Sequence, residues 1–122
     1  MTGPDLRTRQ LVIDRAGRMC ERCETAPGSE VHHRRPRMAG GSRDPRINRP
    51  SNLVLLCGAC HRWVESHRED AREDGWLLRS VAEAATVPVV STWGLTRTLS
   101  DDGTAITDPL RAFCPDGARS PF

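Results

Sequence analysis

The sequence predicts a small α+β protein that uses a bound metal ion to support a thin core. Three observations lead to this prediction. Four of the five cysteines form two Cys-x-x-Cys pairs, residues 4–19 carry apolar side chains near helical spacing, and several short apolar runs follow Trp76. At 122 residues the chain suffices for one domain, but a chain this short buries only about two-thirds of the surface that it exposes when unfolded.

The first half of the chain is expected to contain a helix, a metal knuckle, a strand and a loop. Gly17 marks the expected end of the N-terminal helix. The knuckle Cys20-Glu-Arg-Cys23 follows, then a turn at Pro27-Gly28 and a short strand over residues 30–33. Prolines and glycines interrupt any periodicity over residues 34–49, and a loop of this length in a compact domain is usually functional or disordered.

In the second half, structure is expected to resume at Ser51 and to reach the second knuckle, Cys57-Gly-Ala-Cys60. A charged helix from His61 to Arg72 follows, and Gly75 ends it. Short strands are expected over residues 76–78, 87–90, 93–99 and 104–107. We therefore expect a metal-binding domain over residues 1–75, with residues 76–122 forming a β extension and a flexible tail packed on the same domain.

The spacing of the cysteines favours a structural zinc site. No apolar run approaches the roughly 20 residues that cross a bilayer, and the N-terminus has no signal-like segment, so we expect a cytoplasmic protein without a membrane partner. Disulfide frameworks are disfavoured in the reducing cytoplasm. The two pairs would instead supply four thiolates to tetrahedral zinc, from Cys20, Cys23, Cys57 and Cys60. The alternatives are redox chemistry or unpaired buried thiols. Cys114, near the end of the chain, is expected to be a free thiol.

Positive charge is concentrated between the two knuckles. The formal net charge is only +2 and every basic residue is arginine, but residues 34–49 carry six arginines against one aspartate, a local charge of +5. Arginine forks suit phosphate oxygens, so this segment is expected to bind a polyanion. The alternative is a solvated loop whose charge only aids solubility. The six arginines are Arg34, Arg35, Arg37, Arg43, Arg46 and Arg49.

Several motifs together resemble the zinc-stapled, phage-encoded members of the HNH endonuclease family. They are Cys20-x-x-Cys23, Val31-His-His33, Gly40-Gly-Ser and the run Asn52-Leu-Val-Leu-Leu-Cys-Gly-Ala-Cys-His61-Arg-Trp. The resemblance covers roughly residues 15–68, about half of the chain. It implies a ββα-metal core, in which a divalent ion lies between a β-hairpin and a helix, and it makes residues 1–75 the nuclease domain.

The resemblance also implies roles for the histidines. His33 matches the general base, His32 and His61 match ligands of the catalytic metal, and imidazole suits a base near neutral pH because its ordinary pKa is about 6.5. The metal, which could be Mg²⁺, Mn²⁺, Ni²⁺ or Zn²⁺, stabilises charge on the phosphoryl and leaving oxygens. Two packed or surface histidines are the alternative. Because neighbours on a regular strand point to opposite faces, the pair is expected at an irregular strand end.

Two further residues have open interpretations. Asn52, the central asparagine by resemblance, would hold the loop that bears the base through backbone hydrogen bonds, or it could simply cap a helical turn. Glu65 shares a helix face with His61 and is the expected third metal ligand. Many relatives have a second histidine at this position, and a solvated glutamate is the alternative.

The resemblance implies a metal-dependent DNA endonuclease that nicks or cuts both strands by a one-metal mechanism. The arginine-rich segment would then contact DNA. Phage proteins of this type are often encoded beside the packaging terminase, which suggests terminase as a partner and a host cytoplasm as the location. One alternative is a zinc-stapled DNA-binding or packaging module that has lost cleavage, and the other is a purely structural zinc protein.

Overall fold

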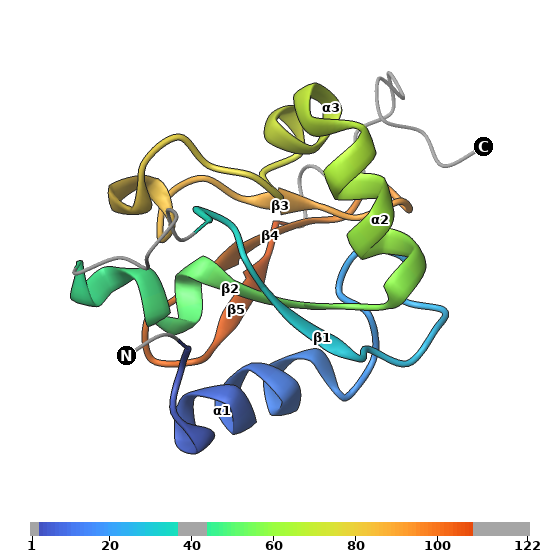
Figure 1. The fold of residues 1–122 in the computed structure, drawn as a ribbon. Helices are drawn as coiled ribbons and strands as arrows, with labels where there is room; N and C mark the ends of the chain where they lie inside the picture. The colour runs from blue at the N-terminus through green and yellow to red at the C-terminus, as the bar shows by residue number, and fades with distance from the viewer. Residues whose placement is uncertain (1–2, 37–43, 109–122) are drawn as a thin grey trace.

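A computed structural model describes residues 3–36 and 44–108 of the chain (Figure 1). Helix α1 spans Leu6–Ala16. At the start of α1, the Asp5 carboxylate accepts a hydrogen bond from the Thr8 N–H at 2.8 Å, and Gly17, with φ of 63°, closes its end as expected.

Some residues of the sequence predictions lie outside the described ranges: the segment Gly40-Gly-Ser, Arg37, Arg43 and Cys114. No helix within residues 3–36 and 44–108 is long and apolar enough to cross a membrane.

A two-stranded hairpin carries the histidine pair. Strand β1 spans Glu30–His33 and pairs antiparallel with β2, Leu53–Leu56, so that His33 lies opposite Leu53. Every residue of β2 is buried. Leu53 and Leu55 pack with Val12 of α1, while the alternate residues enter the main core. Burial on both faces explains why this strand is a continuous apolar run.

The expected charged helix is two helices. Helix α2 spans Gly58–Ser66 and α3 spans Arg68–Glu73, with a break at His67, where φ is −125° and ψ is 58°. The Ser66 hydroxyl donates to the Arg62 carbonyl at 2.9 Å, and the His67 ring stacks on Trp63 with a centroid distance of 5.4 Å. These local bonds compete with continued helix at this point.

The C-terminal segment forms a second sheet of three short antiparallel strands, in the order β3–β4–β5. They span Val89–Val90, Thr96–Leu99 and Ala105–Thr107. The strand expected at residues 76–78 is absent, and that prediction was wrong. The backbone N–H of Trp76 donates to the carbonyl of Ala71 in α3, and that of Leu78 donates to the carbonyl of Arg34. These residues are a buried apolar plug, not part of a ladder.

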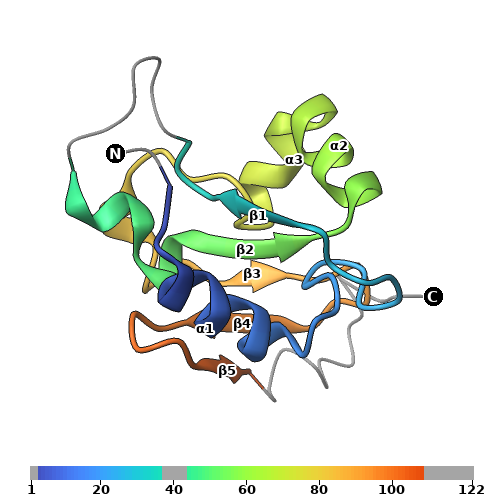
Figure 2. The ribbon, with the colours of Figure 1, turned by 60° about the horizontal axis from the view of Figure 1, so that its bottom comes forward.

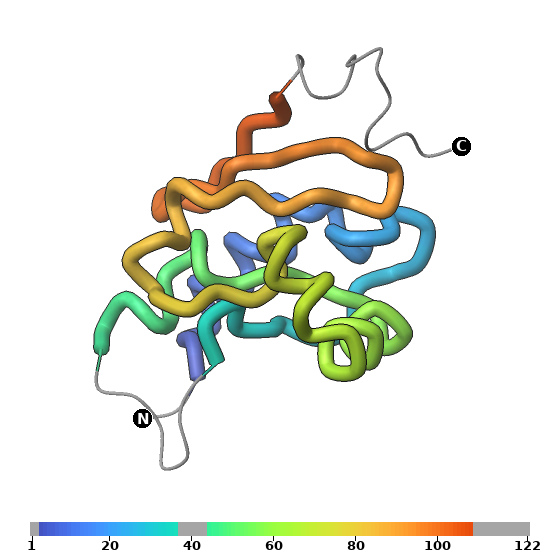
Figure 3. Tube along the Cα trace, turned by 90° about the horizontal axis from the view of Figure 1, so that it is seen from above, coloured from blue at the N-terminus to red at the C-terminus, as the bar shows by residue number. Residues whose placement is uncertain are grey.

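The main core joins the two halves of the chain. It includes Val54, Val64, Trp76, Val89 and Leu99, which come from the hairpin, α2, the plug and the second sheet. Figure 2 shows α1 on one side of the hairpin and α2 with α3 on the other, with β3, β4 and β5 beyond β2. Figure 3 shows the stretch after α3 passing beside the end of β1.

Arg34 is completely buried and does not reach the surface. Its guanidinium donates to the backbone carbonyls of Gly75, Ser51 and Ala84 at 2.8 Å and of Val87 at 2.6 Å. Burial lowers the pKa of Arg34 to about 10, so it stays charged at neutral pH. The prediction that Arg34 contacts DNA was therefore wrong, because its buried guanidinium donates to backbone carbonyls in the interior.

Candidate functional site

The four paired cysteines lie together where α2 begins. The Sγ atoms of Cys20, Cys23, Cys57 and Cys60 all lie within 4.8 Å of one another. Tetrahedral zinc, with Zn–S bonds of about 2.3 Å, holds its sulfurs roughly 3.8 Å apart. In both knuckles the N–H of the second cysteine donates to the sulfur of the first, at 3.5 and 3.4 Å. The cluster is compatible with the closed structural zinc site that the spacing predicted.

The surroundings of these sulfurs also suit a bound cation. Burial raises the pKa of Cys60 to about 12, and the Arg22 guanidinium, which donates to its Sγ at 3.3 Å, opposes that rise. The same guanidinium lies 3.6 Å from the centroid of the Trp63 ring. Thiolates buried in this way need a compensating positive charge, and zinc would supply it.

His32 combines burial with an unused nitrogen. Its ring hydrogen-bonds the backbone of Trp76, while Nε2 is buried and has no hydrogen-bond partner within residues 3–36 and 44–108. Burial, assisted by the nearby His61, lowers the pKa of His32 to about 4, so the ring is neutral near pH 7. A neutral imidazole with an unsatisfied buried nitrogen has the properties of a metal ligand.

His61 and Glu65 complete a second group of ligand atoms on α2. The His61 ring lies 5.3 Å from that of His32, and atoms of His32, His61 and Glu65 lie within 4.8 Å of one another. Glu30, at the start of β1, approaches Nδ1 of His61 to 2.8 Å. Glu65 is about half exposed and also lies 3.7 Å from Arg68. These three side chains could hold one ion, and two open positions would remain in a five-coordinate shell.

His33 lies outside that group and beside Asn48. It is the last residue of β1, so the pair sits at a strand end as expected. Its Nε2 lies 2.8 Å from Oδ1 of Asn48. An amide oxygen only accepts hydrogen bonds, so Nε2 must carry the proton, and the lone pair of the neutral ring is then on Nδ1.

Asn52 is buried and joins the two ends of the arginine-rich segment. Its Oδ1 accepts from the Arg35 N–H at 2.9 Å, and its Nδ2 donates to the Ile47 carbonyl at 2.8 Å. Asn52 itself closes a short 3-10 helix, Pro50–Asn52, whose N-cap makes no side-chain hydrogen bond. These contacts favour the orienting interpretation over the capping one.

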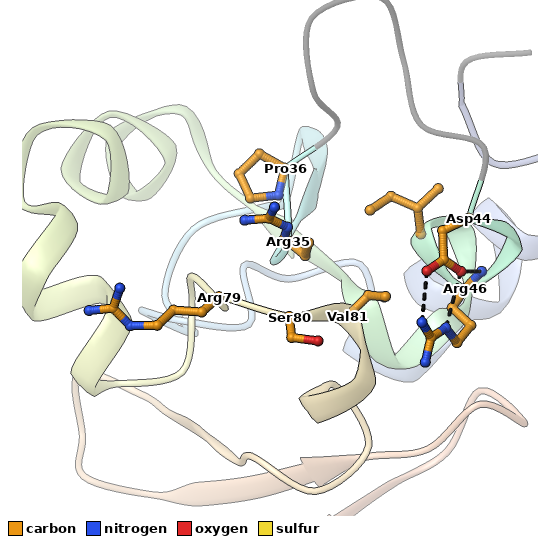
Figure 4. A pocket seen from close by; sticks show the side chains of 8 residues that line it. Arg35, Pro36, Asp44, Arg46, Arg79, Ser80 and Val81 are labelled. Carbon is orange, nitrogen blue, oxygen red and sulfur yellow. Dashed lines mark hydrogen bonds and ion pairs between the residues drawn. The ribbon is translucent and has the colours of Figure 1, made fainter.

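The remaining described arginines of the segment are at the surface or half-buried. Arg46 lies in a second 3-10 helix, Pro45–Asn48, whose N-cap is Asp44, and the Arg46 guanidinium donates to the Asp44 carboxylate at 2.8 and 3.1 Å. Arg49 lies 3.6 Å from Asp101 on the turn between β4 and β5. Arg35 and Arg46 line a common cavity, which a further arginine, Arg79, also lines (Figure 4).

One comparison found a family to which part of this chain is similar. Residues 20–66 match the family model described as HNH endonuclease, a range that includes both knuckles, the histidine pair, Asn52 and His61. Over these residues, fewer than half of the chain, the protein is similar to HNH endonucleases. No curated protein and no solved structure matches the chain. An HNH domain indicates a nuclease or DNA-binding function together with metal binding, and the match gives no support to a terminase partner.

Three residues of the site, Glu30, Asn48 and Arg79, were not predicted from the sequence. Glu30 precedes His32 by two positions, so it shares a strand face with it, and that spacing could have indicated it. Asn48 and Arg79 have no such signal, because each reaches the site through the fold of a loop.

Proposed function

We propose that the chain is a metal-dependent DNA endonuclease that hydrolyses phosphodiester bonds with one catalytic ion and a histidine base. The observation that carries the proposal is the unpartnered buried Nε2 of His32, on a side chain whose ligand atom lies within 4.8 Å of those of His61 and Glu65. A structural zinc protein needs only the four cysteines. A second ligand group, with an imidazole held by Asn48 on the neighbouring residue, has a reason to exist only if it does chemistry.

Each residue of the site has a distinct role in the proposed reaction. Nδ1 of His33 takes a proton from the attacking water, the water oxygen forms a bond to phosphorus, and the bond from phosphorus to the leaving sugar oxygen breaks. His32 and His61, with Glu65, hold the divalent ion. When bound, the ion supplies positive charge for the oxygens on which negative charge develops. Asn52 keeps the backbone after His33 in register by bonding Arg35 and Ile47.

Glu30 positions a ligand in this arrangement. Its carboxylate lies 2.8 Å from Nδ1 of His61, so it can hold the ring by this nitrogen and leave Nε2 to serve as the ligand atom. Carboxylate–histidine pairs of this kind fix both tautomer and ring orientation and raise the basicity of the ligand.

Plasmid cleavage by the zinc-loaded protein tests the proposal directly. We expect cleavage that requires an added ion, with Mn²⁺ or Ni²⁺ at least as effective as Mg²⁺, because imidazole ligands suit transition metals better. Reactions with Mg²⁺, Mn²⁺, Ni²⁺, Zn²⁺ and no added ion would be compared on one gel. Higher activity with Mg²⁺ would contradict a site built on two histidines.

A non-catalytic DNA-binding module is the second candidate, and one observation favours it. Glu65, one of the three candidate ligands, is about half exposed and lies 3.7 Å from Arg68. If no ion supports cleavage while the protein binds DNA in a salt-dependent manner, this second function replaces the first.

Replacing Glu30 tests the metal site without relying on activity. We expect Glu30→Ala to weaken Mn²⁺ binding about 10- to 100-fold, because His61 loses the partner that orients it. Mn²⁺ affinity would be measured by calorimetry on the zinc-loaded protein and compared with the Mn²⁺ dependence of cleavage. Glu69→Ala, an exposed position on α3, is the matched control and should bind Mn²⁺ as the wild type does. Unchanged affinity in Glu30→Ala would exclude this role.

A further inference from the structure

A cavity of about 230 Å³ lies beside the end of β1, between three segments that are distant in the sequence. Arg35 comes from the backbone just after β1, Asp44 and Arg46 from the 3-10 helix that closes the arginine-rich segment, and Arg79 from the stretch after α3. Figure 4 shows Arg35 and Arg79 on one side of the cavity and the Asp44–Arg46 pair on the other. We call it the arginine groove.

The walls of the arginine groove are held by buried bonds. Asn52 bonds the backbone of Arg35 and of Ile47, which joins two walls. The third wall is fixed because the Leu78 N–H donates to the Arg34 carbonyl at 2.8 Å, while the Arg34 side chain holds Ala84. The groove is therefore a built feature of the fold.

The charge of the arginine groove favours an anion. Its lining carries three arginines and one aspartate, a net charge of two positive units. Asp44 stays ionised, because the hydrogen bonds from Arg46 lower the pKa of its carboxyl to about 2. Arg79 is exposed, and its guanidinium makes no hydrogen bond or ion pair with another residue of the described ranges 3–36 and 44–108. Its donors are available to phosphate oxygens.

The basic surface continues beyond the arginine groove. A second cavity, of about 150 Å³, shares Arg46 with it and is also lined by Arg49 and by the ion-pair partner of Arg49, Asp101, so its charged lining residues sum to one positive charge. Positively charged sites thus follow one another from Arg79 through Arg46 to Arg49. A row of cationic sites suits the repeated phosphates of a polynucleotide better than a single small anion.

We propose that the arginine groove binds a phosphodiester group of DNA that flanks the cleaved group on the same strand. Arg79 and Arg46 donate hydrogen bonds to the non-bridging oxygens of this flanking group. This inference rests on the proposed action on DNA. It adds Arg79, which lies outside the arginine-rich segment, and gives the groove a positioning role, because Arg35 in its wall follows the base His33 by two residues. Contacts to the flanking phosphate would hold the strand in register with His33.

The test measures the salt dependence of DNA binding. Zinc-loaded protein, without a catalytic ion, is titrated with a labelled duplex of fixed length at several NaCl concentrations. We expect Arg79→Gln to weaken binding to the same extent for different sequences and to reduce the slope of log K against log salt by about 1. Arg9→Gln, an exposed arginine on α1, makes the same charge change outside the groove and should keep the wild-type slope. Both variants should melt at the wild-type temperature.

A wild-type slope in Arg79→Gln would overturn the inference. Titration with inorganic phosphate separates the two sources of phosphate: phosphate binding that depends on Arg79, with DNA binding that does not, would also overturn the assignment to DNA. The proposed endonuclease function is tested separately, by the plasmid cleavage assay. If the wild type cleaves DNA and Arg79→Gln keeps the wild-type salt slope, only the DNA-binding role of the groove is rejected. If the wild type does not cleave and Arg79→Gln has a reduced slope, the role of the groove is supported and only the nuclease activity is rejected.

Discussion

His33→Ala is expected to lower metal-dependent plasmid cleavage by about 10²- to 10⁴-fold, the usual contribution of a positioned general base. The reason is that Nδ1 of His33 would no longer accept the proton of the attacking water. Metal and DNA binding should persist, because the ligand group of His32, His61 and Glu65 does not include this ring. Initial cleavage rates would be measured at saturating Mn²⁺ alongside duplex affinity.

The matched control is His67→Ala. His67 is exposed, stacks on Trp63 and lies outside the ligand group, so this change removes an imidazole without touching the site. It should cleave at the wild-type rate. Asn48 adds a second check: Asn48→Ala removes the acceptor for Nε2 of His33 and should slow cleavage, whereas Asn48→Asp keeps an acceptor and should recover most of the rate. Full activity in His33→Ala would remove His33 as the base.

Arg34→Leu is expected to destabilise the protein by about 3–5 kcal/mol, the usual cost of breaking a buried charged network by removing one partner. Arg34 is fully buried, and its loss leaves the carbonyls of Gly75, Ser51, Ala84 and Val87 without their donors. Arg34→Lys should also destabilise, since one ammonium group cannot reach four acceptors held by a planar fork. Urea unfolding of the zinc-loaded protein measures the change in free energy of unfolding.

Arg79→Leu is the comparison for Arg34→Leu. Arg79 is exposed, so its replacement should change the free energy of unfolding by less than about 0.5 kcal/mol while weakening DNA binding. Arg34→Leu should show the opposite order of effects, with stability as the main loss. If Arg34→Leu unfolds at the wild-type urea concentration and loses only DNA affinity, the buried network has been misassigned.

Local patterns predicted those parts of the fold whose causes are local. The two knuckles were predicted because a Cys-x-x-Cys spacing places both sulfurs of a pair on one turn of backbone, whatever the rest of the chain does. The same holds for the end of α1 at Gly17, where a left-handed residue closes the helix. The apolar plug at residues 76–78 has the composition of a strand. Its backbone N–H groups nevertheless bond carbonyls of α3 and of Arg34 in place of a neighbouring strand, and only the tertiary structure brings these carbonyls within reach.

The sequence by itself determined the two cysteine knuckles, the strand that carries His32 and His33, and the similarity of residues 20–66 to HNH endonucleases. Only the tertiary structure decided which arginines face outward. Arg34 and Arg35 are adjacent and chemically identical, but the acceptors of Arg34 are backbone carbonyls 17 to 53 residues away. Every residue has a backbone carbonyl, so no pattern of side chains identifies the four carbonyls that accept from Arg34. Whether Arg34 is buried therefore depends on which distant segments of the chain fold back against it.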